Sequence, residues 1–211
     1  MLKFCSSFCD LNDWSLAQLQ NNEQSWNIFL KRNQELASFI RKQNLRGFFE
    51  IHKNSISLKM ATYRHYWSKY NHIWIEAILR DFQFKFDFYV SVYITFFPVY
   101  PRDIEKRRFL VPYTDDLDIV KSIIAHELLH FMFFSKYKGV VDQEIWLVSE
   151  LLVPLYFSYL MQQHSEMGEL YSSNYCLSDK MIVSGSYVFE RYIEKKLSFS
   201  EMILQLIQIV K

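Results

Sequence analysis

The chain has 211 residues, of which 50% are hydrophobic and 18% aromatic, so it is long and apolar enough to bury a substantial core. Its 24 Lys and Arg residues and 23 Asp and Glu residues leave a net charge of +1. This balance supplies no positive field for a phosphate backbone, which disfavours a nucleic-acid partner. Only 4 Gly and 4 Pro residues are present, which excludes collagen-like and low-complexity chains.

Cysteine usage and hydropathy predict a cytoplasmic protein without a membrane span. The three cysteines, Cys5, Cys9 and Cys176, form no disulfide framework, and the N-terminal residues lack the apolar stretch of a secretory signal. The most apolar segment, residues 145–161, is shorter than the roughly 20 residues that span a bilayer, and it contains a glutamate and a proline. We therefore expect a buried core helix there.

The first 80 residues are expected to form a helical layer. Apolar residues recur at three- and four-residue spacing over residues 11–43, which predicts a helix. Residues 44–47 break this pattern, and a short extended segment is expected over residues 48–58. The aromatic segment at residues 60–79 again has helical spacing.

The hydrophobic period then changes to two, which is typical of a strand. In residues 86–96 the even-numbered positions are all apolar, which predicts a half-buried strand. After a charged loop comes a second apolar run, residues 109–113, in which Pro112 cannot donate to a sheet ladder. This run is therefore expected to be an edge strand or no strand. An edge strand there can bind an extended peptide substrate by strand addition.

Four helices are expected in the remainder of the chain. Asp116 and its neighbours supply capping and first-turn acids for a helix over residues 116–135, which is apolar nearly all round and therefore belongs inside a domain. A second apolar helix is expected over residues 142–163, and two more over residues 179–196 and 198–210.

The central helix contains the sequence His-Glu-Leu-Leu-His at residues 126–130. His126 and His130 are four positions apart, so they project from one helix face and both imidazoles can reach one metal ion. Glu127 lies beside them and can accept a proton from a metal-bound water. The competing interpretation is a pair of buried histidines with ordinary hydrogen bonds. Burying such a polar group costs several kcal/mol unless it is compensated, which favours a metal ion.

A catalytic zinc ion needs a third protein ligand and an open fourth position. Glu144 and Glu150 are the candidates downstream. Glu144 lies at the start of its helix, where an acidic residue is expected in any case because it complements the helix dipole. Glu150 is a lone carboxylate in a segment that is expected to be buried, so it needs a partner. We therefore favour Glu150, presented to the two histidines after a turn near Gly139.

The histidine pair with Glu150 twenty positions past the second histidine resembles the gluzincin metallopeptidases, which include thermolysin-like enzymes and the small minigluzincins. The resemblance covers residues 86–160 and implies an α+β, mostly helical, zincin-like fold. In that fold a small antiparallel sheet packs its edge strand on the active-site helix. It also implies Zn²⁺ bound by His126, His130 and Glu150, Glu127 as the general base, and a peptide or protein substrate. Residues 1–80 then form an N-terminal helical layer and residues 81–211 the catalytic part, within one folding unit.

Two positions depart from the family pattern. An aspartate four positions after the glutamate ligand supports the first histidine in thermolysin-like enzymes, and Pro154 occupies that position here. The usual asparagine before the glutamate ligand is Ser149. Support for the ligands must therefore come from elsewhere, and Ser149 and Asp118 are the candidates.

Peptide hydrolysis also needs a donor that stabilises the oxyanion. Tyr187 and His164 follow Glu150 in the sequence and are weak candidates for that role, because no motif distinguishes them. The other familiar metallopeptidase class, with a third histidine and a glycine shortly after the pair, does not fit, because residues 131–138 contain neither.

Three alternatives remain open. The first is a catalytically silent zinc-stabilised helical domain that acts as a protein-interaction module, with Cys176 or His164 as a fourth ligand that closes the site. The second is a helical interaction module with no metal. The third is a peptidase held latent by its apolar C-terminal segment, residues 198–211.

Overall fold

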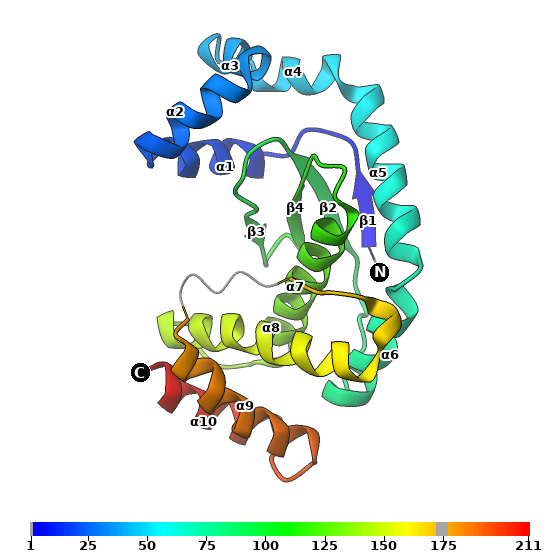
Figure 1. Ribbon diagram of the computed structural model, residues 1–211, viewed down its shortest axis with the longest axis vertical. Helices are drawn as coiled ribbons and strands as arrows, with labels where there is room; N and C mark the ends of the chain where they lie inside the picture. Colours follow the sequence, from blue (N-terminus) through cyan, green and yellow to red (C-terminus); the bar gives the residue numbers. More distant parts are fainter. Residues whose placement is uncertain (1, 172–176) are drawn as a thin grey trace. The chain divides into compact units, whose positions relative to one another are not determined.

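The computed structural model describes residues 2–171 and 177–211, which combine many helices with one small sheet (Figure 1). This confirms the expected α+β class. The sheet is mixed rather than antiparallel, so that part of the prediction was wrong: β1 pairs parallel with β2, β2 pairs parallel with β4, and only β3 pairs antiparallel with β4.

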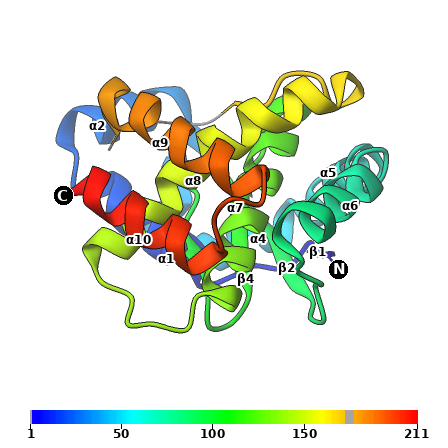
Figure 2. The same ribbon diagram turned by 90° about the horizontal axis from the view of Figure 1, so that it is seen from below.

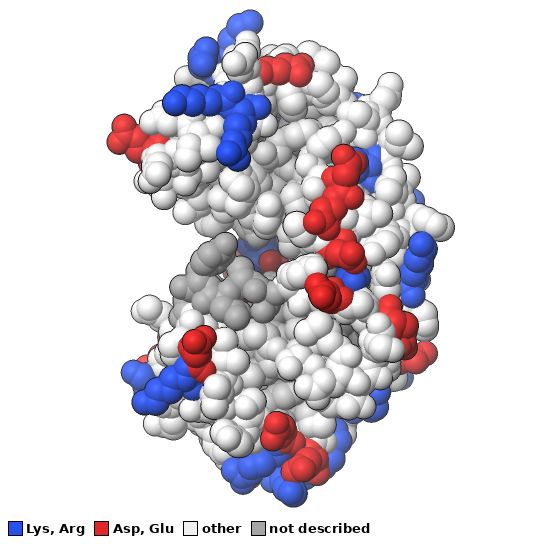
Figure 3. Space-filling view, viewed as in Figure 1, with Lys and Arg blue, Asp and Glu red and all other residues white. Residues whose placement is uncertain are grey.

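The chain divides into two compact units, and each contains residues from both sides of position 80. The first unit comprises Met1–Ser68 and Asp87–Val120, and the second comprises Lys69–Phe86 and Lys121–Lys211. Figure 3 shows Lys and Arg side chains interspersed with Asp and Glu over the face in view, in keeping with the net charge of +1.

The sheet belongs to the first unit and has the strand order β1-β2-β4-β3. Its inner strands are the most buried, because Val90, Val92, Phe109, Leu110 and Val111 are all 0% exposed. The strands are β1 (Leu2–Cys5), β2 (Val90–Thr95), β3 (Arg102–Asp103) and β4 (Arg108–Pro112).

The expectation of an edge strand at residues 109–113 was wrong, because β4 lies between β2 and β3. Pro112 is tolerated at this inner position for a local reason. The N–H of Tyr113 donates to the carbonyl of Thr95 on β2, whereas the N–H of Leu110 donates to Pro101 on the other side. Since alternate residues of a strand point to opposite sides, the nitrogen of Pro112 faces the β3 side, beyond the end of this two-residue strand.

The helices of the first unit are shorter and more numerous than predicted. The single helix expected over residues 11–43 is broken at Asn22 and Asn33, which precede α2 and α3. Asn22 caps α2 by accepting a hydrogen bond from the N–H of Ser25 at 2.9 Å. At the expected break after residue 43, Asn44 caps the next helix by accepting a hydrogen bond from the N–H of Gly47 at 3.0 Å. The extended segment expected over residues 48–58 is helical instead. The helices are α1 (Leu11–Gln20), α2 (Glu23–Arg32), α3 (Gln34–Arg41), α4 (Leu45–Ile51) and α5 (Lys53–Ser68).

The four C-terminal helices are confirmed, and the second unit contains three of them whole together with most of α7. In this unit α8, α9 and α10 pack against one another, as Figure 2 also shows. The C-terminal helix packs its apolar face inward, because Met202, Ile203, Leu206 and Val210 are buried. The bounds are α6 (Asn71–Phe82), α7 (Leu117–Lys136), α8 (Gln143–Gln163), the 3₁₀ turn η1 (Ser165–Met167), α9 (Asp179–Ile193) and α10 (Phe199–Val210).

The longest of these helices, α8, is long and apolar enough to cross a membrane by length and composition alone. In the structure, 56% of its most apolar 18-residue window is buried inside the protein, and core helices of soluble proteins pass the same test. The absence of a membrane span therefore stays a prediction.

Candidate metal centre

The two histidines of the motif lie on consecutive turns of α7. The start of this helix is capped by Asp116, whose carboxylate accepts a hydrogen bond from the N–H of Ile119 at 3.1 Å. The helix is continuous through the motif, so His126 and His130 project from the same face. The His126 side chain is 13% exposed and the His130 side chain 0%. The two Nε2 atoms lie 2.9 Å apart.

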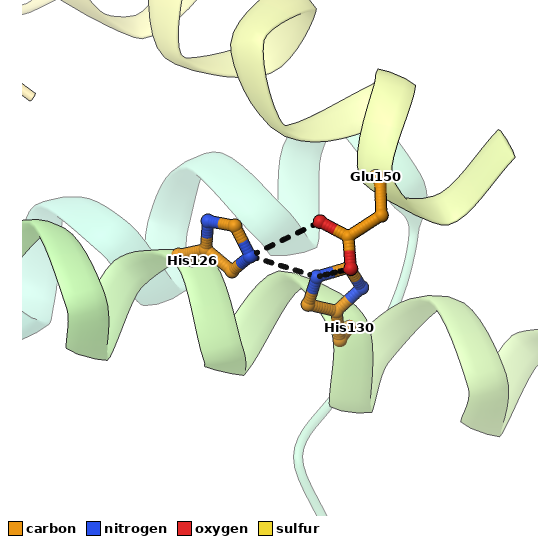
Figure 4. A group of neighbouring side chains, drawn as sticks. All are labelled: His126, His130 and Glu150. Carbon is orange, nitrogen blue, oxygen red and sulfur yellow. Dashed lines mark hydrogen bonds and ion pairs between the residues drawn. The ribbon is translucent and has the colours of Figure 1, made fainter. Parts of the chain in front are cut away.

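The neighbouring helix α8 presents Glu150 to this pair (Figure 4). Asp142 caps α8 by accepting a hydrogen bond from the N–H of Ile145 at 2.9 Å. The two carboxylate oxygens of Glu150 then lie 3.5 Å from the Nε2 of His126 and 3.5 Å from the Nε2 of His130, and the Glu150 side chain is only 10% exposed. The predicted ligand set is thus brought together from residues that are distant in the sequence.

The spacing of the donor atoms fits one small cation. One ligand atom from each of the three residues can be chosen so that all lie within 4.8 Å of one another. Donors at about 2.1 Å from a tetrahedral zinc ion are about 3.4 Å apart. The two Nε2 atoms are 2.9 Å apart, and each lies 3.5 Å from a different oxygen of Glu150, so these separations lie on either side of this value. Two imidazoles and a carboxylate are also donors that zinc accepts in catalytic sites.

The surroundings make the cluster expensive without a compensating charge. On α7, Ala125, Leu129 and Phe131 are at most 1% exposed, and on α8 Leu151 is 0% exposed. Glu127, next to His126 in the sequence, is a second carboxylate with only 5% exposure. Burying carboxylates among apolar side chains is costly unless charge and hydrogen bonds compensate them. A divalent cation is well matched to this need.

The two residues expected to support the ligands have other partners. The hydroxyl of Ser149 donates to the carbonyl of Trp146 at 2.7 Å, within its own helix. The carboxylate of Asp118 accepts a hydrogen bond from the hydroxyl of Tyr66 at 2.8 Å, and both residues belong to the first unit. Pro154 lies inside α8 and has no N–H, so the carbonyl of Glu150 lacks its usual helical donor.

The structure does not bring the weaker candidates into this cluster. His164 follows the end of α8, fourteen residues and therefore about 21 Å of helix beyond Glu150, and its Nδ1 lies 3.4 Å from Glu166. Tyr187, on α9, is 66% exposed. Glu144 pairs with Lys211 at 3.4 Å. Cys176 lies outside the described residues.

Sequence reasoning missed two buried polar residues whose hydrogen bonds hold the helices of the second unit together. The first is Asp81, which is 3% exposed. Its carboxylate accepts hydrogen bonds from Arg80 at 2.6 and 2.9 Å and from the hydroxyl of Tyr156 on α8 at 3.1 Å. Its carbonyl accepts one from the hydroxyl of Tyr192 on α9 at 2.8 Å. Asp81 thereby ties both helices to the end of α6.

The second missed residue is Lys121 on α7, which is 1% exposed. Its ammonium group donates to the carbonyl of Met167 at 2.6 Å and lies 4.9 Å from the ring centroid of Tyr70. One residue further, the hydroxyl of Ser122 accepts a hydrogen bond from the N–H of Tyr171 at 3.0 Å. These contacts fix the segment after α8 against the helix that contains the histidines. A lysine within an apolar helix was the only sequence feature that indicated such a role.

Comparison of the chain with protein-family models gave no match, and neither did comparison with curated proteins or with solved structures. Only the residues and their geometry therefore bear on what this centre does.

Proposed function

We propose that the protein is a zinc-dependent peptidase of the gluzincin type, in which His126, His130 and Glu150 hold the metal and Glu127 is the general base. One observation carries this proposal: the carboxylate of Glu150 meets both imidazoles, with each oxygen 3.5 Å from an Nε2 atom. A chance occurrence of the His-Glu-Leu-Leu-His sequence gives no reason for a glutamate from another helix to converge on it.

The number of donors supports a catalytic site over a structural one. A structural zinc site has four protein ligands, whereas a catalytic site has three and leaves a position for water or substrate. Over residues 2–171 and 177–211, the group that can hold a metal contains three residues. The alternative of a silent, zinc-stabilised interaction domain requires a fourth ligand. Of its two candidates, His164 is about 21 Å of helix from Glu150, and Cys176 lies outside the described residues.

When bound, a zinc ion supplies a Lewis acid that polarises a peptide carbonyl and lowers the pKa of a water molecule. The role assigned to Glu127 is to take a proton from that water as it attacks the carbonyl carbon. The same carboxylate then delivers the proton to the amine that leaves when the C–N bond breaks.

Metal analysis and a peptide-library digest of the full-length protein test the proposal. We expect one zinc per chain in the wild type and in Glu127→Gln, and none in His130→Ala, because only the last variant removes a ligand. Cleavage is expected to fall by at least about 100-fold in Glu127→Gln, in which the base is removed.

Exposed residues of the same type provide controls. His65→Ala and Glu76→Gln alter solvent-exposed positions of α5 and α6, and both are expected to keep metal and activity. Zinc retained by His130→Ala, or cleavage undiminished in Glu127→Gln, would refute the assignment. Zinc retained without any cleavage of the library would favour the silent interaction domain instead.

A further inference from the structure

The first unit contains an open cavity of about 460 Å³ at one end of its sheet. It lies between α2 and the segments that follow β2 and β4. Those two strands are parallel, and Thr95 pairs with Pro112 at their carboxyl ends. Crevices outside the carboxyl ends of parallel strands are a common place for ligands.

The cavity walls are largely aromatic and are held by ring contacts. Phe29 from α2 packs on Phe97 with ring centroids 5.5 Å apart. Phe96 stacks on Tyr113 with centroids 4.8 Å apart and an interplanar angle of 25°. Phe97 is only 1% exposed, so the base of the wall is anchored in the core. Such a preformed apolar surface suits a large apolar or aromatic group, and the volume falls within the range of small-ligand pockets.

The lining contains a single charged residue, Arg32, and no carboxylate. Arg32 forms no ion pair within the part of the chain that the structure describes, and it lies on the solvent-exposed side of α2. Its neighbour Asn33 is held in place because its amide donates to the carbonyl of Phe29 at 2.9 Å. A guanidinium group at the rim of an apolar cavity favours a ligand with a carboxylate next to its apolar group.

We propose that this cavity binds the C-terminal residue of a peptide that ends in an aromatic or large aliphatic side chain. The side chain occupies the aromatic walls and the terminal carboxylate pairs with Arg32. A peptide is favoured over a free aromatic acid for two reasons. The cavity is open, so a chain can leave it, and Ser25, Asn33 and Thr114 in its lining can bond to backbone amides. This binding activity does not depend on the proposed peptidase function.

The test measures the affinity of the full-length protein for acetyl-Ala-Phe with a free carboxylate, for the same peptide as its C-terminal amide, and for acetyl-Ala-Ala. Calorimetry and ligand-observed NMR give the affinities, and mass spectrometry checks that the peptides stay intact. We expect the free acid to bind at least about tenfold more tightly than the amide or the alanine peptide.

The variant Arg32→Gln is expected to abolish the difference between acid and amide, while Lys31→Gln, a change at the preceding exposed residue, leaves it intact. Ser25→Phe fills the cavity and is expected to weaken the binding of both the free acid and the amide of acetyl-Ala-Phe. The metal-site variant His130→Ala is expected to bind as the wild type does, which separates this proposal from the proposed enzyme activity.

Equal affinity for acid and amide, an unchanged ratio in Arg32→Gln, or no binding of the free acid at millimolar concentration would overturn the proposal. Benzoate binding as tightly as acetyl-Ala-Phe would also overturn it, because the cavity would then be a site for small aromatic acids.

Discussion

Replacing Glu150 with Gln removes the anionic donor of the candidate metal centre while preserving the size of the side chain. If the wild type binds zinc as proposed, zinc at a concentration 100 times its Kd is expected to stabilise the native state by about 2.7 kcal/mol. For a chain of 211 residues this corresponds to a rise in Tm of about 5–11 °C. Each Glu150 oxygen lies 3.5 Å from a histidine Nε2. We therefore expect that replacing the Glu150 carboxylate with an amide lowers the affinity for the metal by at least about 100-fold. At the same zinc concentration the stabilisation then falls to about 0.4 kcal/mol, or about 1–2 °C.

Thermal unfolding followed by circular dichroism, with and without added zinc, measures this difference. Glu144→Gln is the matched control, because Glu144 lies on the same helix but is 42% exposed and pairs with Lys211. It is expected to keep the full zinc-dependent rise. A rise in Glu150→Gln as large as in the wild type would show that the metal binds elsewhere, and no rise in the wild type would remove the basis of the proposed function.

Three further predictions concern stability. Asp81→Ala removes a buried carboxylate that accepts three hydrogen bonds. Urea denaturation is expected to show that the free energy of unfolding falls by about 3 kcal/mol. A fall below about 1 kcal/mol would contradict the role of Asp81 in holding the helices together. Burial raises the pKa of Tyr63 to about 12, so its contribution to stability is present below pH 10 and is lost as the pH rises from about 10 towards 12. Tyr63→Phe should flatten that dependence, and an unchanged profile between pH 9 and 12 would refute it. Hydrogen bonding to Arg108 lowers the pKa of Asp10 to about 2, so its contribution is present above pH 4 and is lost as the pH falls towards 2. Because the Asp10 side chain is 56% exposed, acid titration of Asp10→Asn should differ from the wild type by less than about 1 kcal/mol.

The long helices were predictable because their hydrophobic spacing is a local property of the sequence. The same spacing was overlooked over residues 48–58, where Phe48 and Ile56 begin a buried row that Met60, Tyr63 and Trp67 continue at intervals of three or four residues. This row belongs to α4 and α5, and its spacing is that of a helix rather than of an extended segment.

The sheet was less predictable because its pairing is non-local. The strand β1 has only four residues, and its partner Val90 is 88 positions from Leu2. A strand this short has too few residues for an alternating pattern to be recognised. The parallel pairing of β2 with β4 also requires the chain between them, which contains β3, to cross back to the start of the sheet. No local feature of residues 96–107 indicates this connection.

The candidate site also combines features that the sequence reveals with features that it does not. The candidate ligands can be recognised from local sequence, because His126 and His130 have the spacing of one helix face and Glu150 is a lone carboxylate in an apolar segment. The orientation of α8 that joins them is not local. The hydroxyl of Tyr156, six residues after Glu150, donates to Asp81, which is 75 positions away in the sequence. A contact at that separation leaves no periodic pattern, yet it ties α8 to the end of α6. The residues of the candidate metal centre can therefore be named from the sequence, whereas the residues that hold them in place emerge only from the fold.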